Sequence, residues 1–360
     1  MISILIFLAP LQHTVIPIYH EAVQQWLAIK PLYVNSGMYY FPQFVFIFMP
    51  FDLLPVPLGD IIWCIFSTAL FVWGLWRIIT LAYPQKDKLL FYYATLIALT
   101  PSLGAVRNGQ ANVIFAAFAV HSAVCLARSQ WWVASLCLLG AFFIKPIGLV
   151  MLLLAVLVYR PLIWRLCLGL LIFLVLPFLF TDPSYVLSQY QQAIKRLFAA
   201  SLVTEHRFAD LNGLLRTLGI GLTGSVSQII RIIAGLITAI IWFIGAQQLR
   251  EPQRACLFQG LATTYLMLFN PMTEVNSYVI VAPFLALYAI RFLIIEGRPV
   301  LGWGLIFMGL SIGLFPEIFR SVDRNFGLWW SPIMMLIFGA ILIYSVLSMN
   351  YRKQITSIRN

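Results

Sequence analysis

The sequence predicts an all-α, polytopic integral membrane protein whose residues 1–360 form a single transmembrane domain. Three totals lead to this fold class: 62% of the 360 residues are hydrophobic, 15% are aromatic and 10% are charged. A soluble chain of this length with so few charges would not stay dispersed, whereas lipid-facing helices need such a composition. The apolar residues fall into runs separated by short polar turns, which predicts about 10–12 transmembrane helices together with interfacial helices that face outward.

The basic residues, histidines and cysteines argue against several other classes of site. The net charge of +11 comes from Lys and Arg residues scattered through short loops, so no nucleic acid is expected as a partner. The four histidines show no metal-ligand spacing, and we expect neither a metal nor another cofactor. The cysteines all lie inside apolar runs, which is typical of packing residues: Cys64, Cys125, Cys137, Cys167 and Cys256.

The chain begins with an apolar run over residues 1–11, which is shorter than the ~17 residues needed to cross a bilayer. This run lacks the basic segment and the cleavage site of a signal peptide. Either the true start lies upstream, or the first helix continues toward Pro17. In the loop 12–40, apolar residues recur at helical spacing and predict a helix in the interface plane: Ile18, Ala22, Trp26 and Ile29.

A proline-rich apolar run over residues 39–57 comes before a series of membrane spans. Each expected span is an apolar stretch bounded by charged or turn residues. The expected spans are 58–80, 89–106, 113–127, a broken pair over 131–159, 162–180, 228–248, 256–269, 278–293, 301–315 and 332–349.

Lys145 and Pro146 interrupt the apolar run 131–159. As one helix, these 29 residues would extend about 43 Å, which is too long for a hydrocarbon core of about 30 Å. Because proline breaks a helix, we expect two segments that enter the membrane and return, with Lys145 at the tip. An ammonium group in hydrocarbon costs roughly 2.5–3.5 kcal/mol, so the tip should line a wet, protein-walled cavity. The alternative is that the long side chain snorkels to the interface.

Loops that carry Lys or Arg set the expected orientation. By the positive-inside rule, the short basic loops are cytoplasmic: 81–88, 128–130, 160–165, 249–255 and 291–299, with the tail 350–360. The longer loops then face outward: 12–40, 181–224 and 316–331. In the second of these, apolar residues four apart predict an amphipathic helix, which either rests on the outer leaflet or fills a gap between spans: Val186, Tyr190, Ile194 and Phe198.

Two groups of polar residues on the outward side are candidates for chemistry. One combines an arginine with three amides: Arg107, Asn108, Gln110 and Asn112. The other is the carboxylate of Glu274, in the turn LFNPMTEVNSY, which can take a proton from an acceptor hydroxyl at a wet membrane mouth. Glu21 is a similar case, and either carboxylate is alternatively a solvated surface residue. The chain lacks Asp-x-Asp and G-x-x-x-x-G-K-S/T motifs, so a lipid-linked phosphate fits better than a soluble nucleotide.

The residues that follow Arg107 resemble the signature of family 87 glycosyltransferases, polytopic GT-C enzymes that include polyprenyl-phosphate-mannose-dependent mannosyltransferases. In that family a G-Q-x-N turn opens a helix and a K-P step follows, as residues 109–112 and 145–146 do here. Three other segments resemble parts of the family pattern more loosely: YYFPQFVFIFMPFDLLP, LNGLLRTLG and LFNPMTEVNSYVIVAPFLAL. Two features depart from the family pattern. No aspartate lies near Tyr19, and Val275-Asn276 stands in place of a His-His pair.

The resemblance implies a GT-C-like membrane glycosyltransferase that moves a sugar, such as mannose, from a polyprenyl-phosphate carrier to a lipid- or glycan-linked acceptor. It would work among the lipids of the plasma (inner) membrane, with its active site facing the extracytoplasmic side. The proton acceptor would be Glu274 or Glu21. The donor phosphate and sugar would be held by Arg107, Asn108, Gln110, Asn112 and Lys145, with help from Arg207 and Arg216. The alternatives are a transporter or flippase of lipid-linked sugars, and a catalytically inactive family member.

Overall fold

The computed structural model describes residues 14–34, 37–85, 87–203 and 208–359, and the apolar run 1–11 lies outside these ranges. The described residues form helices joined by turns and loops, with no β-strand among them. Segments of 3-10 or π-helix are labelled η. The elements are α2 (Ile16–Leu27), α3 (Gln43–Asp52), α4 (Val56–Ala82), α5 (Asp87–Arg107), α6 (Asn112–Ala127), α7 (Trp131–Ile144), η1 (Pro146–Gly148), α8 (Leu149–Val158), α9 (Leu162–Val175), η2 (Leu176–Leu179), α10 (Pro183–Leu202), α11 (Leu211–Thr217), α12 (Gly224–Gln248), α13 (Gln253–Phe269), η3 (Val275–Ile280), α14 (Ala282–Ile290), η4 (Arg291–Ile295), α15 (Pro299–Ile318), η5 (Phe319–Ser321) and α16 (Phe326–Arg359).

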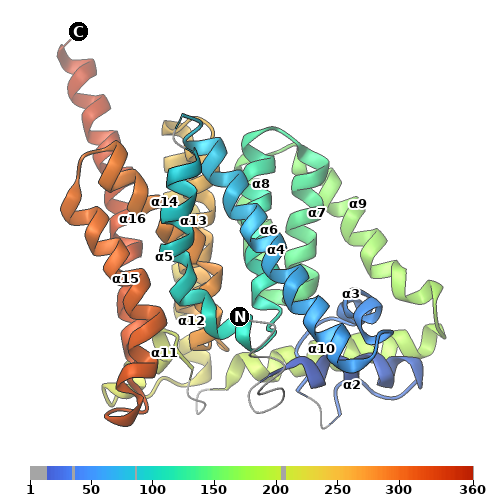
Figure 1. Ribbon diagram of the computed structural model, residues 1–360. Helices are drawn as coiled ribbons and strands as arrows, with labels where there is room; N and C mark the ends of the chain where they lie inside the picture. Colours follow the sequence, from blue (N-terminus) through green and yellow to red (C-terminus); the bar gives the residue numbers. More distant parts are fainter. Residues whose placement is uncertain (1–13, 35–36, 86, 204–207, 360) are drawn as a thin grey trace.

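The bundle has two distinct ends (Figure 1). The chain passes from one end to the other in each of α4 to α9 and again in α12 to α16. The helices α2, α3, α10 and α11 all lie at one end, which we call the site end. The turns at the opposite end, which we call the basic end, carry arginines: Arg128, Arg160, Arg250 and Arg298. The loops therefore divide between the two ends as the sequence predicts.

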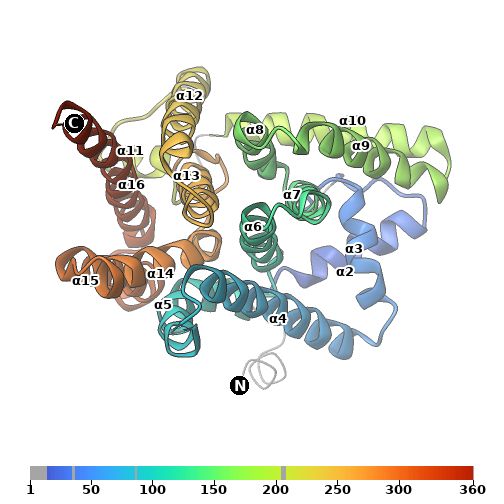
Figure 2. The ribbon, with the colours of Figure 1, turned by 90° about the horizontal axis from the view of Figure 1, so that it is seen from above.

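Among the described residues, six helical segments are long and apolar enough to cross a bilayer: α4, α5, α9 with η2, α12, α15 with η5, and α16. Shorter apolar helices are also present, and two of them, α6 and α7, lie in the interior of the bundle. The 16 residues of α6 are almost all buried and pack against α4 and α7 (Figure 2). By contrast, α9 and α12 expose aliphatic side chains such as Leu171 and Ile232, where lipid replaces water. The predicted all-helical, multi-pass membrane fold is confirmed.

The break at Lys145-Pro146 occurs where the sequence places it. Helix α7 ends at Ile144, and Lys145 adopts an extended backbone with φ −139° and ψ 124°. This is the conformation that a following proline imposes by steric contact with the preceding residue. The chain then turns through η1 into α8, so Lys145 lies at the site end, between a descending and an ascending helix.

The two predicted amphipathic helices exist, but their buried faces differ from the predicted ones. In α2, Ala22 and Trp26 are buried as expected, whereas Ile29 lies beyond the last turn and is 59% exposed. In α10, Ile194 and Phe198 are 62% and 63% exposed. The buried face of α10 includes Gln189, whose Oε1 accepts a hydrogen bond from the backbone N–H of Leu32 at 2.9 Å. The helix therefore packs against the protein on one side and keeps an apolar stripe outside.

His20 holds α2 against the start of α4 and the end of α3. Its Nε2 lies 2.8 Å from Asp60 Oδ1, and its Nδ1 contacts Asp52. Burial lowers the pKa of the imidazole, but the hydrogen bonds to the two carboxylates outweigh burial and raise the pKa above its usual value. The bridge fixes the position of the neighbouring Tyr19, which reaches the candidate site.

Candidate active site

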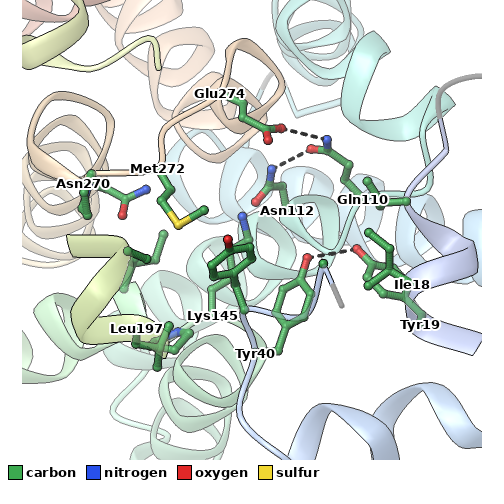
Figure 3. Close-up of a pocket in the computed structure, with 17 residues that line it drawn as sticks. Ile18, Tyr19, Tyr40, Gln110, Asn112, Lys145, Leu197, Asn270, Met272 and Glu274 are labelled. Atoms are coloured by element: carbon green, nitrogen blue, oxygen red, sulfur yellow. Dashed lines mark hydrogen bonds between the residues drawn. The ribbon is translucent and has the colours of Figure 1, made fainter. Parts of the chain in front are cut away.

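A cavity of about 520 Å³ opens at the site end, among segments that are far apart in the sequence (Figure 3). Its walls come from α2 and the loop after it, the turn between α5 and α6, the break between α7 and α8, helix α10, and the turn between α13 and η3. Polar and charged side chains converge from these walls: Tyr19, Tyr39, Tyr40, Gln110, Asn112, Lys145, Asn270 and Glu274.

The turn between α5 and α6 is shaped by Gly109, whose φ of +62° is a conformation that L side chains rarely adopt. The indole N–H of the buried Trp63 donates to the Gly109 carbonyl at 2.8 Å, which holds the turn against α4. Helix α6 then begins at Asn112. As a result, Gln110 and Asn112 are both buried and both line the cavity.

A chain of amides connects this turn to Glu274. Gln110 Nε2 donates to Glu274 Oε2 at 3.3 Å, and Asn112 Nδ2 donates to Gln110 Oε1 at 2.8 Å. Asn112 Nδ2 also lies 3.4 Å from Ser277 Oγ, on the same turn as Glu274. Because the carboxylate accepts at one end, each amide points its oxygen away from Glu274. Asn112 Oδ1 is buried and has no hydrogen-bond partner in the described part of the chain.

Lys145 enters the cavity from the break between α7 and α8, and Figure 3 shows its ammonium group pointing toward Asn112. Over the described residues, no hydrogen bond or ion pair joins this ammonium group to another side chain. Burial lowers the pKa of Lys145, and the charge of Glu274 partly counteracts the shift. The cavity therefore contains a cation and a carboxylate that are not paired with each other.

Tyr19 and Tyr40 form a second hydrogen-bonded pair in the cavity wall. Their hydroxyl oxygens are 3.2 Å apart, and the backbone N–H of Ala111 donates to the Tyr19 hydroxyl at 3.0 Å. The two hydroxyls share this hydrogen bond, in which either can be the donor, and the Tyr40 side chain lines the cavity. The Tyr40 ring stacks on Phe44, with 4.4 Å between ring centroids. Burial raises the pKa of Tyr40 to about 12, so this hydroxyl remains a donor at neutral pH.

A comparison of the sequence with models of known protein families identifies the family of this chain. The model of glycosyltransferase family 87 matches residues 39–273, more than half of the chain. The chain belongs to glycosyltransferase family 87. No curated protein and no solved structure gives a significant match. This family 87 chain is therefore a membrane glycosyltransferase. The matched range includes Gln110, Asn112 and Lys145, and it ends one residue before Glu274.

The structure brings together Gln110, Asn112, Lys145 and Glu274 among the predicted site residues of this family 87 chain. The other predicted residues do not line the cavity. Arg107 is exposed at the end of α5, and the Asn108 carbonyl accepts from the backbone N–H of Val15 at 3.2 Å. Glu21 is exposed and accepts from Gln25 Nε2 at 2.8 Å. Arg216 lies in α11, at a second hollow, and Arg207 lies outside the described residues.

Sequence reasoning missed the tyrosine pair, because no local pattern marks two residues that meet only in the folded chain. The signal available was the YYFP run that begins at Tyr39, in which two aromatic hydroxyls precede a proline turn. Among the described residues, no group of three or more His, Cys, Asp or Glu side chains is arranged to hold a metal ion.

Proposed function

We propose that this glycosyltransferase takes a sugar, such as mannose, from a polyprenyl-phosphate carrier and transfers it to a lipid- or glycan-linked acceptor. One observation carries the proposal: the unpaired ammonium of Lys145 and the carboxylate of Glu274 face the same cavity of about 520 Å³. The cavity lies at the opposite end of the bundle from the basic turns. The positive-inside rule then supports an active site on the extracytoplasmic face of the plasma membrane.

The donor phosphate is the group that pairs with Lys145. An ammonium group without a partner in a partly desolvated cavity favours an anion, and a phosphate oxygen offers both charge and a hydrogen-bond acceptor. The Tyr40 O–H is a second donor at the same wall. Apolar residues such as Ile147 and Leu197 line the cavity beside these polar groups, and they suit the first isoprene units of the carrier.

Glu274 is the proposed general base. The acceptor hydroxyl attacks the anomeric carbon of the sugar, and its proton passes to Glu274. The bond between the anomeric carbon and the phosphate oxygen breaks, and its electron pair leaves with polyprenyl phosphate. Gln110 donates to one oxygen of the carboxylate, Oε2, and so helps to hold the carboxylate in place at the cavity wall. A positioned base of this kind contributes about 10²–10⁴ to the rate.

The test uses purified protein in detergent with a polyprenyl-phosphate sugar and membrane lipids as the acceptor source. Release of polyprenyl phosphate, coupled to labelling of an acceptor, is the expected result. We expect Glu274→Gln to lower kcat about 10²–10⁴-fold, while Glu21→Gln, the matched change at an exposed carboxylate, leaves kcat unchanged. Movement of the donor across vesicles without release would identify a flippase instead. Equal activity of both variants would remove Glu274 as the base.

A further inference from the structure

A second hollow, of about 730 Å³, opens at the site end between α11 and the start of α16. Figure 1 shows these two elements side by side at that end of the bundle, and their residues pack against each other. The polar residues of its wall come from both sides: Arg216 and Thr217 from α11, and Asp323, Asn325 and Trp329 from the loop before α16 and its first turn. None of the residues that line this hollow lines the donor cavity.

Trp329 is held in a fixed orientation at this hollow. Its indole N–H donates to Asp323 Oδ2 at 3.0 Å, and the backbone N–H of Asn325 donates to Asp323 Oδ1 at 2.7 Å. These two hydrogen bonds lower the pKa of the Asp323 carboxyl, so the carboxylate keeps its charge at neutral pH. Phe326 packs against the indole, with 4.7 Å between ring centroids. The ring is therefore a rigid surface, and no side-chain freedom is lost when a ligand packs on it.

The polar groups around Trp329 suit a saccharide. A pyranose ring has a C–H face that packs on an aromatic ring, and hydroxyls at its rim that need donors and acceptors. Asn325 lines the same wall, and a side-chain amide can both donate to and accept from sugar hydroxyls. Arg216 adds a cationic donor on the opposite wall. An aromatic residue that merely anchors the protein at the membrane surface would turn its N–H toward lipid headgroups, whereas this N–H is bonded to Asp323.

Both walls of the hollow are attached to the turn that carries Glu274. On one side, the backbone N–H of Ala209, just before α11, donates to the Thr273 carbonyl at 2.6 Å. On the other side, Gly327 packs so closely on Val275 that a Cβ at Gly327 would lie 2.8 Å from Val275 Cγ2. Thr273 and Val275 flank Glu274 in the sequence. A ligand in the hollow would thus contact two elements that are both joined to the turn carrying Glu274.

We propose that this hollow binds the saccharide chain of the acceptor, with Trp329 as the stacking surface and Asn325 as a hydroxyl partner. The inference rests on the proposed transferase function, because it gives the acceptor its own subsite beside the base. It assigns the donor to the cavity around Lys145 and the acceptor to the hollow.

The experiment measures saccharide binding without any donor, so it is separate from the transfer reaction. The probes are soluble oligosaccharides of mannose, glucose and N-acetylglucosamine, titrated against the full-length protein in detergent by saturation-transfer difference NMR. At least one probe is expected to bind the native protein. Trp329→Ala should weaken that binding about tenfold, and Trp329→Phe, which keeps an aromatic ring, should weaken it less. The control is Trp303→Ala, which removes an indole that is 61% exposed on α15.

Three results would overturn the proposal: no probe binds, Trp329→Ala binds as well as the native protein, or Trp303→Ala loses binding equally. Asn325→Ala provides a second test if Trp329→Ala fails to fold, with the same expected direction. A protein that binds the probes through Trp329 but releases no polyprenyl phosphate would refute the proposed transfer reaction and leave the saccharide site in place.

Discussion

Replacing Lys145 with methionine should affect stability and activity in opposite directions. The ammonium group lines the cavity without a hydrogen bond or ion pair to any described side chain. Burial already lowers its pKa, which means that the fold disfavours the charged form. Methionine keeps the length of the stem and removes the charge. Lys145→Met therefore removes a desolvated cation, breaks no contact, and should leave the free energy of unfolding unchanged or slightly higher.

The loss of function is estimated from the interaction that the lysine would make with the donor. A hydrogen bond that involves a charged group contributes about 1.5–3 kcal/mol. At 1.36 kcal/mol per factor of ten, the loss corresponds to about a 10- to 150-fold fall in kcat/KM for the polyprenyl-phosphate sugar. Lys145→Arg should retain part of this binding free energy, because the positive charge remains although the shape of the charged group differs.

The assay pairs donor kinetics with thermal unfolding of the same detergent preparations. Lys195→Met is the matched control, since this lysine is exposed on α10 at the same end and does not line the cavity. A Lys145→Met protein that unfolded at a markedly lower temperature while its kcat/KM for the donor stayed unchanged would contradict a role of Lys145 in donor binding. That result would identify Lys145 as a structural residue.

Three further predictions follow from the site end. Tyr40→Phe removes a hydroxyl from the cavity wall but keeps the aromatic packing, so kcat/KM for the donor should fall about tenfold, whereas Tyr92→Phe, at an exposed tyrosine, should not change it. Burial raises the pKa of Asp210 from 3.8 to about 6, so the native protein should lose about 2.4 kcal/mol of stability as pH rises from 4 to 7. Asp210→Asn lacks this loss and should exceed the native protein in unfolding free energy by a margin that grows over that range; a constant margin would contradict the shift. Gly109→Ala forces a side chain into φ +62° and within 2.5 Å of Ile16 Cδ1, and should destabilise the protein by at least 1–2 kcal/mol in thermal unfolding; an unchanged melting temperature would show that the turn relaxes.

The fold was largely predictable because hydrocarbon leaves few choices. An apolar run too long for one crossing, broken by Pro146, must fold back, and the structure places the break at Lys145. The faces of the interfacial helices were less predictable. Periodicity finds the apolar side of α10 but does not say whether lipid or protein covers that side. In the structure the apolar Ile194 is exposed, whereas the polar Gln189 is buried, because its side chain accepts a hydrogen bond from a backbone N–H.

The site was predictable where one turn or one break carries the residues. Gln110 and Asn112 lie on a single turn fixed by a glycine, and Lys145 lies at a forced helix end. Arg107 belongs to the last turn of α5, where it is exposed and does not line the cavity. The YYFP run draws attention to Tyr40, but its pairing with Tyr19 could not be predicted, because the two residues come from α2 and from the loop before α3 and meet only in the folded chain.

The resemblance to family 87 leads us to expect a catalytic aspartate a few residues before Tyr19, and the sequence has none there, so we propose Glu274 as the base instead. A base must touch the acceptor hydroxyl, so it belongs where the donor cavity meets the acceptor. Glu274 lies on the turn to which both walls of the second hollow are attached, and Gln110 extends the amide chain of the family's G-Q-x-N turn to its carboxylate. If Glu274 has taken over the role of base, the Gln110 hydrogen bond should matter as well. Gln110→Ala should then lower kcat more than it raises the donor KM, whereas a residue that only fills the cavity wall would raise KM alone.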